Sequence, residues 1–233
     1  MSNAADRTIK GFMYQFHKTL LTILLSRPED KIVIEGYIED IDVFKIDETK
    51  CIQCKYYESK ETLAASWIAA PILKMMCSYI ENREVYFELY VYFKECGSGE
   101  RLELSEEFIR KIYNTTNQDN VVNFFPNIFE VQNTEIQSLI AKSKKTKEDK
   151  KKIYNYFSTE KEKLKCKITN TEISEHIHII MGESYDSICT SIKSKLETLG
   201  YDNDTVGNLI YPNAITFIAS ISILPDISQR TVT

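Results

Sequence analysis

One stretch of the chain, "IEGYIEDIDVFKIDETKCIQCKYYES" (Ile34 to Ser59), carries most of what the sequence indicates about architecture. Its β-preferring residues predict a long strand over 31–46, a polar turn at 47–50 and a returning strand over 51–57. Charged side chains on such half-buried strands are costly unless something binds them. A salt-bridged hairpin or a metal site would each remove that cost, so this hairpin is the candidate functional element.

The position of the turn decides which side chains meet across the hairpin. With Glu48-Thr49 at its centre, Asp42 lies opposite Lys55, and alternation fixes the faces. The residues expected to share one face are Asp40, Asp42, Gln53 and Lys55. Glu35 falls on the other face unless a bulge intervenes, and Gly36 is a plausible place for one.

Two carboxylates, an amide oxygen and an ammonium suit a hard divalent cation and a phosphoester. The backbone carbonyl of Cys54 would add an oxygen ligand. Lys55 beside a metal-bound water could stabilise a developing hydroxide or orient the attacking water. The alternative is structural: Asp42 and Lys55 form a cross-strand ion pair, and Asp40 is solvated. The residue pattern leaves both interpretations open.

The elements around the hairpin indicate the fold class. Helical periodicity predicts helices over 8–26 and 61–79, the second kinked or split at Pro71. "EVYFELYVYF" (84–93) is nearly continuous in apolar residues, as is typical of a strand buried on both faces. The order helix, strand, strand, helix, strand predicts an α/β fold with a central mixed sheet flanked by helices.

The second half of the chain is predicted to be mainly helical. We expect a single domain over 1–233, with its core in 1–100 and a helical elaboration in 101–233. Truncation of the chain before a C-terminal sensor or regulatory domain is left open. Helices are predicted over 104–113, 135–141, 184–199 and 204–220. A charged helix from Lys142 is expected to give way to a short strand at "KLKCKI".

Composition limits the possible partners. The formal charge of −5 gives no global attraction to nucleic acid or to an anionic membrane. Six cysteines without a signal peptide predict a cytoplasmic, reduced protein, and we interpret the Cys51/Cys54 CxxC spacing as accidental because it falls within a strand. No apolar run approaches the ~20 residues of a membrane span.

Lysines are densest between 142 and 152, and this segment is the candidate DNA-binding surface. The predicted contacts are Lys142, Lys144, Lys145, Lys147 and Lys151. Such a run could neutralise several phosphates without reading sequence. The alternative is a solvated helix face whose lysines are interleaved with acids such as Glu148 and Asp149.

The hairpin, together with "ADRTIKGFMYQF" before it, resembles the PD-(D/E)XK nuclease superfamily in its QxK variant, as in Mrr-like restriction enzymes. Residues 6–80 resemble the N-terminal double-stranded DNA endonuclease domain of bacterial anti-phage effectors, including those of cyclic-oligonucleotide and Lamassu-type systems. The resemblance implies a restriction-endonuclease-like fold and Mg²⁺- or Mn²⁺-dependent hydrolysis of phosphodiester bonds. It also implies control by a homo-oligomer or by a sensor or activator subunit.

Carried over by residue, the resemblance makes Asp40 the metal-binding acid, Gln53 the replacement of the usual second acid and Lys55 the catalytic lysine. Glu35 becomes an additional acid. Gln15 would lie near the site, or alternatively tie a helix to the sheet as a buried amide. The hairpin geometry favours Asp42 and the resemblance favours Asp40, so both are retained. A catalytically inactive, nuclease-like interaction module of a defence complex is the alternative function.

Overall fold

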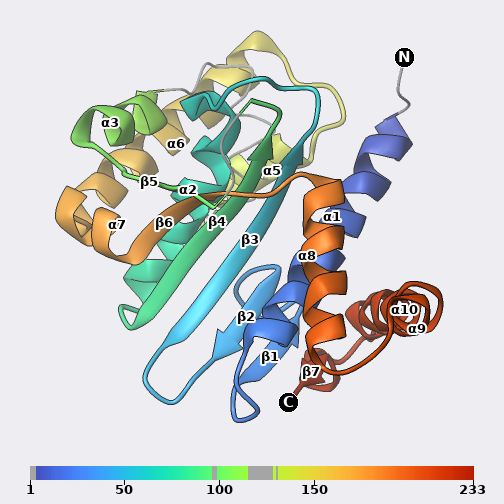
Figure 1. Ribbon diagram of the computed structural model, residues 1–233. Helices are drawn as coiled ribbons and strands as arrows, with labels where there is room; N and C mark the ends of the chain where they lie inside the picture. The colour runs from blue at the N-terminus through green and yellow to red at the C-terminus, as the bar shows by residue number, and fades with distance from the viewer. Residues whose placement is uncertain (1–3, 96–98, 115–127, 130) are drawn as a thin grey trace. The chain divides into compact units, whose positions relative to one another are not determined.

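The computed structural model describes residues 4–95, 99–114, 128–129 and 131–233. The fold is α/β, with a seven-stranded mixed sheet flanked by helices, as predicted (Figure 1). The chain divides into two compact units. Unit 1 comprises Met1–Thr62, Glu84–Leu102 and Ile179–Thr233, and unit 2 comprises Leu63–Arg83 and Glu103–His178.

The sheet has the strand order β5-β6-β4-β3-β2-β1-β7. Its strands are β1 (Lys31–Ile34), β2 (Ile41–Phe44), β3 (Thr49–Tyr57), β4 (Val85–Phe93), β5 (Arg101–Leu102), β6 (Ile177–Met181) and β7 (Thr231–Val232). β1, β2 and β3 form an antiparallel meander, and β4 pairs parallel to β3 along its whole length. The predicted strands at 51–57 and 84–93 are confirmed, and β4 is buried at every position except Tyr86 and Tyr92.

The predicted long strand over 31–46 is wrong, because a tight turn at 35–40 breaks it into β1 and β2. The Glu35 N–H donates to the Asp40 carbonyl at 2.8 Å, and the Gly36 N–H donates to the Glu39 carbonyl at 2.9 Å. A Cβ on Gly36 would lie 2.3 Å from Oδ2 of Asp42, so only glycine fits this close approach. Of the polar residues expected to share one face, Asp40 therefore lies in this turn, whereas Asp42 lies in β2.

The predicted hairpin register is also wrong. The Lys45 N–H donates to the Glu48 carbonyl, so the β2–β3 turn is centred on Ile46-Asp47 rather than on Glu48-Thr49. Asp42 consequently pairs with Cys51, not with Lys55. The ladder with β2 extends along β3 as far as Ile52, and Lys55 lies beyond it.

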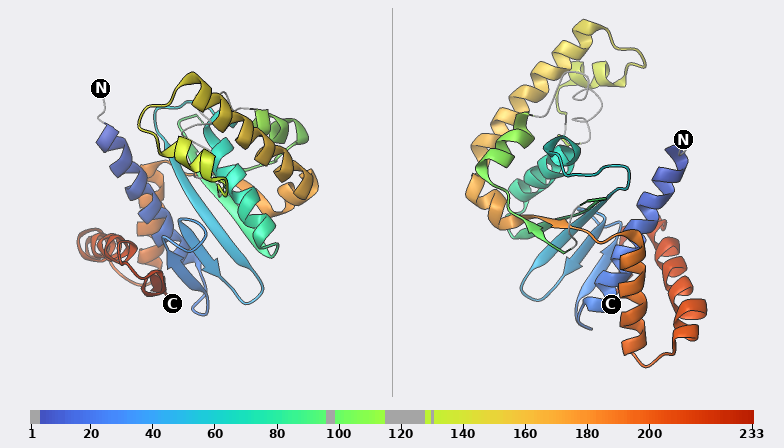
Figure 2. Two further views of the ribbon diagram at one scale, coloured as in Figure 1. Left: turned by 180° about the vertical axis from the view of Figure 1, so that it is seen from behind. Right: turned by 45° about the horizontal axis from the view of Figure 1, so that its top comes forward.

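The α-helices that the structure describes in unit 1 are α1 (Ala4–Leu25), α8 (Tyr185–Thr198), α9 (Asn203–Thr205) and α10 (Tyr211–Ser222). These confirm the predicted helices at 8–26 and 184–199, and the one at 204–220 apart from a π-helical turn at Val206–Ile210. α1 and α8 lie side by side in Figure 1, and Figure 2 shows α8 beside α10. The core between these helices and the strands includes Tyr14, Leu21, Ile41, Ile52, Ile188 and Ile218.

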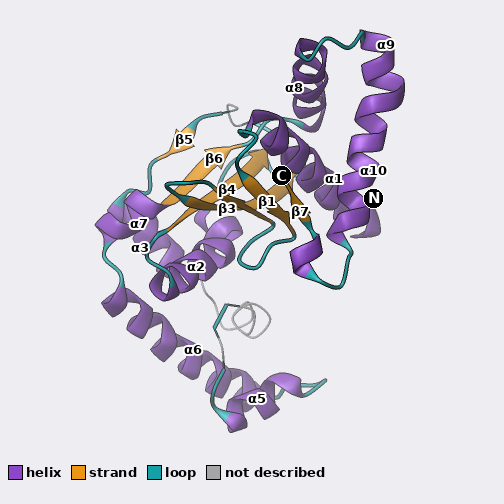
Figure 3. Ribbon diagram, turned by 90° about the horizontal axis from the view of Figure 1, so that it is seen from below, coloured by secondary structure: helices purple, strands orange, loops and turns teal. Residues whose placement is uncertain are grey.

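Unit 2 contains α2 (Ala65–Glu81), α3 (Glu106–Asn114), α5 (Thr134–Ala141), α6 (Lys147–Lys167) and α7 (Asn170–His176), and Figure 3 shows α5 beside α6. α2 continues through Pro71 without being split. The predicted strand at "KLKCKI" is wrong because α6 continues through it, supported by ion pairs such as Lys163–Glu160. Across the described residues, no helix combines the length and apolarity that a membrane crossing requires.

Candidate functional site

Asp40 contacts β3 at Cys54, beyond Ile52, where the pairing with β2 ends. Its Oδ2 accepts a hydrogen bond from the backbone N–H of Cys54 at 2.8 Å. The N–H and C=O of one strand residue point to the same side, so the Cys54 carbonyl also faces the Asp40 side of β3. Asp40 and Cys54 thus supply a carboxylate and a carbonyl oxygen at one point on this strand.

Gln53 and Lys55 flank that point, and alternation puts both side chains on the same face of β3. Gln53 is only 9% exposed, yet its amide makes no hydrogen bond to any residue that the structure describes. The Lys55 ammonium group likewise has no hydrogen-bond or ion-pair partner within the described ranges. Both groups therefore keep hydrogen-bonding capacity that a ligand could use.

Glu35 reaches the same region from the turn after β1. Its backbone has a φ of 46°, a left-handed conformation that is uncommon outside glycine. The turn holds it there, because its N–H donates to Asp40 and its carbonyl accepts from Nη1 of Arg230 at 3.1 Å. Strained backbone of this kind concentrates at functional sites.

The Glu35 carboxyl is tuned by its neighbours. Burial raises its pKa above the ordinary glutamate value, and the charge of Asp40 raises it further. The hydrogen bond from Gln15 and the charges of Arg230 and Lys55 oppose that rise without cancelling it. A carboxyl with a raised pKa beside an acid and a lysine is a functional-site signal.

Gln15 comes from α1 and is 6% exposed. Its Nε2 donates to Oε1 of Glu35 at 2.6 Å, so its amide both ties the helix to the turn and lies at the site. The two roles weighed for Gln15 from the sequence are therefore compatible.

Asp42 is fully buried and serves the turn. Its Oδ2 accepts from the Ile38 N–H at 3.0 Å, and its Oδ1 accepts from the Glu39 N–H at 3.1 Å. The cross-strand pair of Asp42 with Lys55, expected from the shifted register, does not form. Both carboxylate oxygens of Asp42 accept backbone hydrogen bonds. Asp40 is therefore the better candidate for a metal ligand.

The donor set near β3 offers a divalent cation oxygen atoms rather than a cluster of acids. Within the described ranges, no three His, Cys, Asp or Glu side chains lie close enough together to hold a metal ion. An ion at β3 would instead rely on the Asp40 carboxylate, the Gln53 amide and the Cys54 carbonyl. These are all hard oxygen donors of the kind that Mg²⁺ accepts together with several waters.

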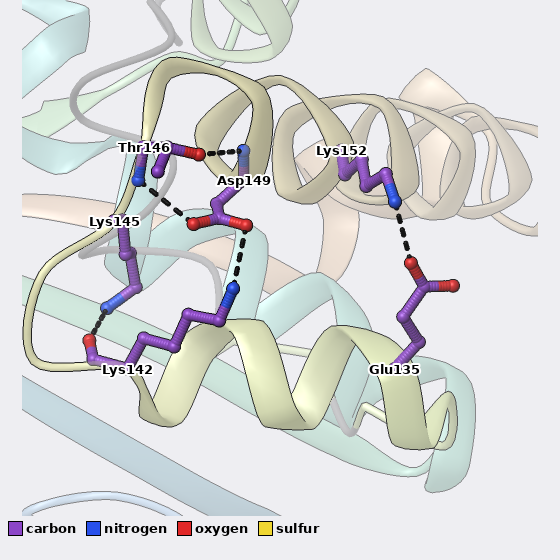
Figure 4. A network of polar contacts seen from close by, with 6 residues as sticks. All are labelled: Glu135, Lys142, Lys145, Thr146, Asp149 and Lys152. Atoms are coloured by element: carbon purple, nitrogen blue, oxygen red, sulfur yellow. Dashed lines mark hydrogen bonds and ion pairs between the residues drawn. The ribbon is translucent and has the colours of Figure 1, made fainter.

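The lysine segment lies in unit 2, and local contacts use part of it (Figure 4). Lys142 binds Asp149 at 3.0 Å, and Lys145 donates to the Lys142 carbonyl at 2.9 Å. Asp149 forms a capping box with Thr146 at the start of α6. The remaining predicted contacts, all exposed, are Lys144, Lys147 and Lys151.

Sequence reasoning missed Arg230. It lies beside the two-residue strand β7, and its Nε donates to the Leu224 carbonyl at 2.7 Å while Nη1 reaches Glu35. A lone arginine in "DISQRTVT" has no local pattern that would announce this contact across 195 positions of sequence. Only the pairing of β7 with β1 brings it to the turn.

The comparisons with known proteins gave no match: no family model, no curated protein and no solved structure is similar to this chain.

Proposed function

We propose that this chain is a metal-dependent endonuclease that hydrolyses phosphodiester bonds in double-stranded DNA. The observation that supports it best is the meeting of Asp40 with the Cys54 backbone, between the side chains of Gln53 and Lys55. The succession of one helix, three antiparallel strands, a helix and a parallel strand agrees with the resemblance. The geometry and the resemblance both favour the "IQCKYY" strand, β3, as the strand that carries the reacting groups.

A divalent ion would be held by Asp40, Gln53 and the Cys54 carbonyl. When bound, Mg²⁺ or Mn²⁺ neutralises charge on the phosphoester and lowers the pKa of a bound water. Lys55 donates a hydrogen bond to a phosphate oxygen or to the attacking water. Glu35 accepts the proton of that water, a role that its raised pKa favours, while Gln15 holds its other oxygen.

The test is cleavage of supercoiled and linear duplex DNA by the full chain with Mg²⁺ or Mn²⁺, against EDTA. The variant is Lys55→Ala, and the matched control is Lys195→Ala, an exposed lysine on α8. We expect metal-dependent cleavage in the wild type and the control, and none in Lys55→Ala. Equal cleavage by both variants would refute the assignment of the site.

One observation favours a second candidate, a catalytically inactive interaction module. Only one carboxylate would contact the ion directly, so the site has less charge for binding it than two acids would give. This candidate predicts no binding of Mn²⁺ by calorimetry, with or without a duplex, and no effect of Asp40→Asn on assembly with a partner. Saturable Mn²⁺ binding that Asp40→Asn abolishes would exclude it.

A further inference from the structure

A pocket of about 700 Å³ lies in unit 1 at the carboxyl ends of the parallel strands β3 and β4. Its walls come from α1, from the ends of these two strands and from the first turn of α8. Ligands of open α/β sheets bind beyond the carboxyl ends of parallel strands, and a volume of this size suits a small molecule. None of its residues takes part in the site at Asp40.

Three tyrosines from three elements form the pocket's aromatic wall: Tyr56 of β3, Tyr92 of β4 and Tyr185 of α8. Tyr56 and Tyr92 are register partners, and their rings stack with centroids 5.0 Å apart and planes at 15°. All three rings are half-buried, so each is supported by the protein and remains partly open. Such rings provide a stacking surface for a planar ligand.

The wall is held in place from behind. Tyr14 is fully buried, its ring lies 4.7 Å from that of Tyr56, and its hydroxyl donates to the Glu183 carbonyl at 2.9 Å. The Tyr90 hydroxyl accepts from the Glu183 N–H at 3.0 Å. A Cβ on Gly182 would lie 2.3 Å from the Tyr14 hydroxyl. The entry into α8 is thus locked against the rings, which makes the pocket preorganised.

Polar groups of both signs stand around this wall. Lys10 binds both carboxylate oxygens of Glu58, at 2.9 and 2.7 Å. The exposed ammonium of Lys94 has no ion-pair partner within the described ranges, so it is available to an anion. A planar heterocycle joined to an anionic group, which is a nucleotide, matches this combination.

We propose that this pocket binds a nucleobase, with its ring against Tyr56, Tyr92 and Tyr185 and its phosphate towards Lys94. The base could belong to a free nucleotide or to an unpaired position in a nucleic acid strand. Cys54 and Tyr56 are two residues apart on β3, about 6.6 Å along the strand. The second source therefore rests on the proposed function and would direct cleavage to DNA with unpaired bases, whereas the first source is independent of it.

Binding is to be measured on the full chain in EDTA, where metal-dependent cleavage cannot occur. One arm follows the fluorescence anisotropy of a labelled short oligothymidylate, and the other follows AMP by saturation-transfer NMR. The variants are Tyr92→Leu, which keeps an apolar side chain but removes the ring, and Lys94→Glu on the surface. The matched control is Tyr201→Leu, a tyrosine that is 49% exposed elsewhere in unit 1.

We expect Tyr92→Leu and Lys94→Glu each to weaken binding about tenfold, and Tyr201→Leu to leave it unchanged. Binding of AMP that competes with the oligonucleotide assigns the pocket to nucleotides in general, and binding of the oligonucleotide alone assigns it to strands. The proposal is overturned if neither ligand binds, or if folded Tyr92→Leu and Lys94→Glu bind as wild type does. Either result leaves the outcome of the cleavage assay unaffected.

Discussion

Replacing Asp42 by alanine should destabilise the fold, whereas replacing Asp40 by alanine should mainly remove activity. Asp42→Ala takes the acceptor from two backbone N–H groups, those of Ile38 and Glu39, at a fully buried position. A buried donor left unsatisfied costs about 1–3 kcal/mol, so we expect a loss of about 2–4 kcal/mol once some water enters the turn. That is a large part of a typical stability of about 5–15 kcal/mol.

Asp40→Ala removes the acceptor of the Cys54 N–H at a part-buried position of β3. We expect it to cost about 1 kcal/mol and to abolish metal-dependent cleavage. The assay is urea denaturation followed by circular dichroism, with the change in midpoint converted through the m-value. Cleavage is then measured on whichever variants remain folded.

Two results would contradict the expected difference between Asp42→Ala and Asp40→Ala. If Asp42→Ala unfolds at the wild-type midpoint but no longer cleaves DNA, Asp42 is a functional ligand and its turn contacts are dispensable. If Asp40→Ala retains cleavage, the assignment of Asp40 to the metal is wrong. A loss of stability in Asp42→Ala alone would support the division of labour that the hydrogen bonds indicate.

Three further predictions concern the turn and two buried titratable groups. Gly36→Ala should lower the unfolding midpoint, because its Cβ would meet Asp42 at 2.3 Å; an unchanged midpoint would contradict the close approach. The pKa of Glu35 is raised in the folded state, so its charged form opposes folding and this cost appears as pH rises through its unfolded and folded values. Glu35→Gln should therefore be more stable than wild type at neutral pH and indistinguishable at pH below both values, and a reversed order would refute this. The pKa of His17 is lowered by burial, so its contribution to stability is present above the unfolded value and falls as pH drops through that range. His17→Gln should lose less stability between pH 7 and pH 5 than wild type does, as measured by thermal unfolding.

The sequence predicted best those elements whose signal is local composition. The apolar run that became β4 and the helical periodicities of α1 and α8 each reflect which side chains are buried, and that information is present in neighbouring residues. The α/β class follows from the order of such elements. The short strands β5 and β7, two residues each, exist only through their partners and carry no such signal.

The broken strand has its physical source in bonding between a side chain and the backbone. Alternation along 31–46 fits a strand as well as it fits two strands and a turn, and the carboxylate of Asp42 decides between them. The register of the next turn is marked by the backbone hydrogen bond from Lys45 to Glu48, which places the apolar Ile46 at the turn centre where the sequence favoured the polar Glu48-Thr49. Tertiary contacts such as that of Arg230 with Glu35 cannot be predicted from neighbouring residues in the sequence.

The two aspartates of "EDID" show how a turn can build a site. Asp42 faces inward and closes the turn on the backbone of Ile38 and Glu39, which fixes the path of the chain through Asp40. The hydrogen bond from the Glu35 N–H to the Asp40 carbonyl then joins these two acids where the turn closes. Asp40 thereby contacts Cys54, on the part of β3 that lies beyond the ladder with β2, and Glu35 contacts Gln15. In the proposed nuclease, a carboxylate that does not contact the substrate would thus determine the positions of Asp40 and Glu35, so the conformation of the turn and the activity should change together.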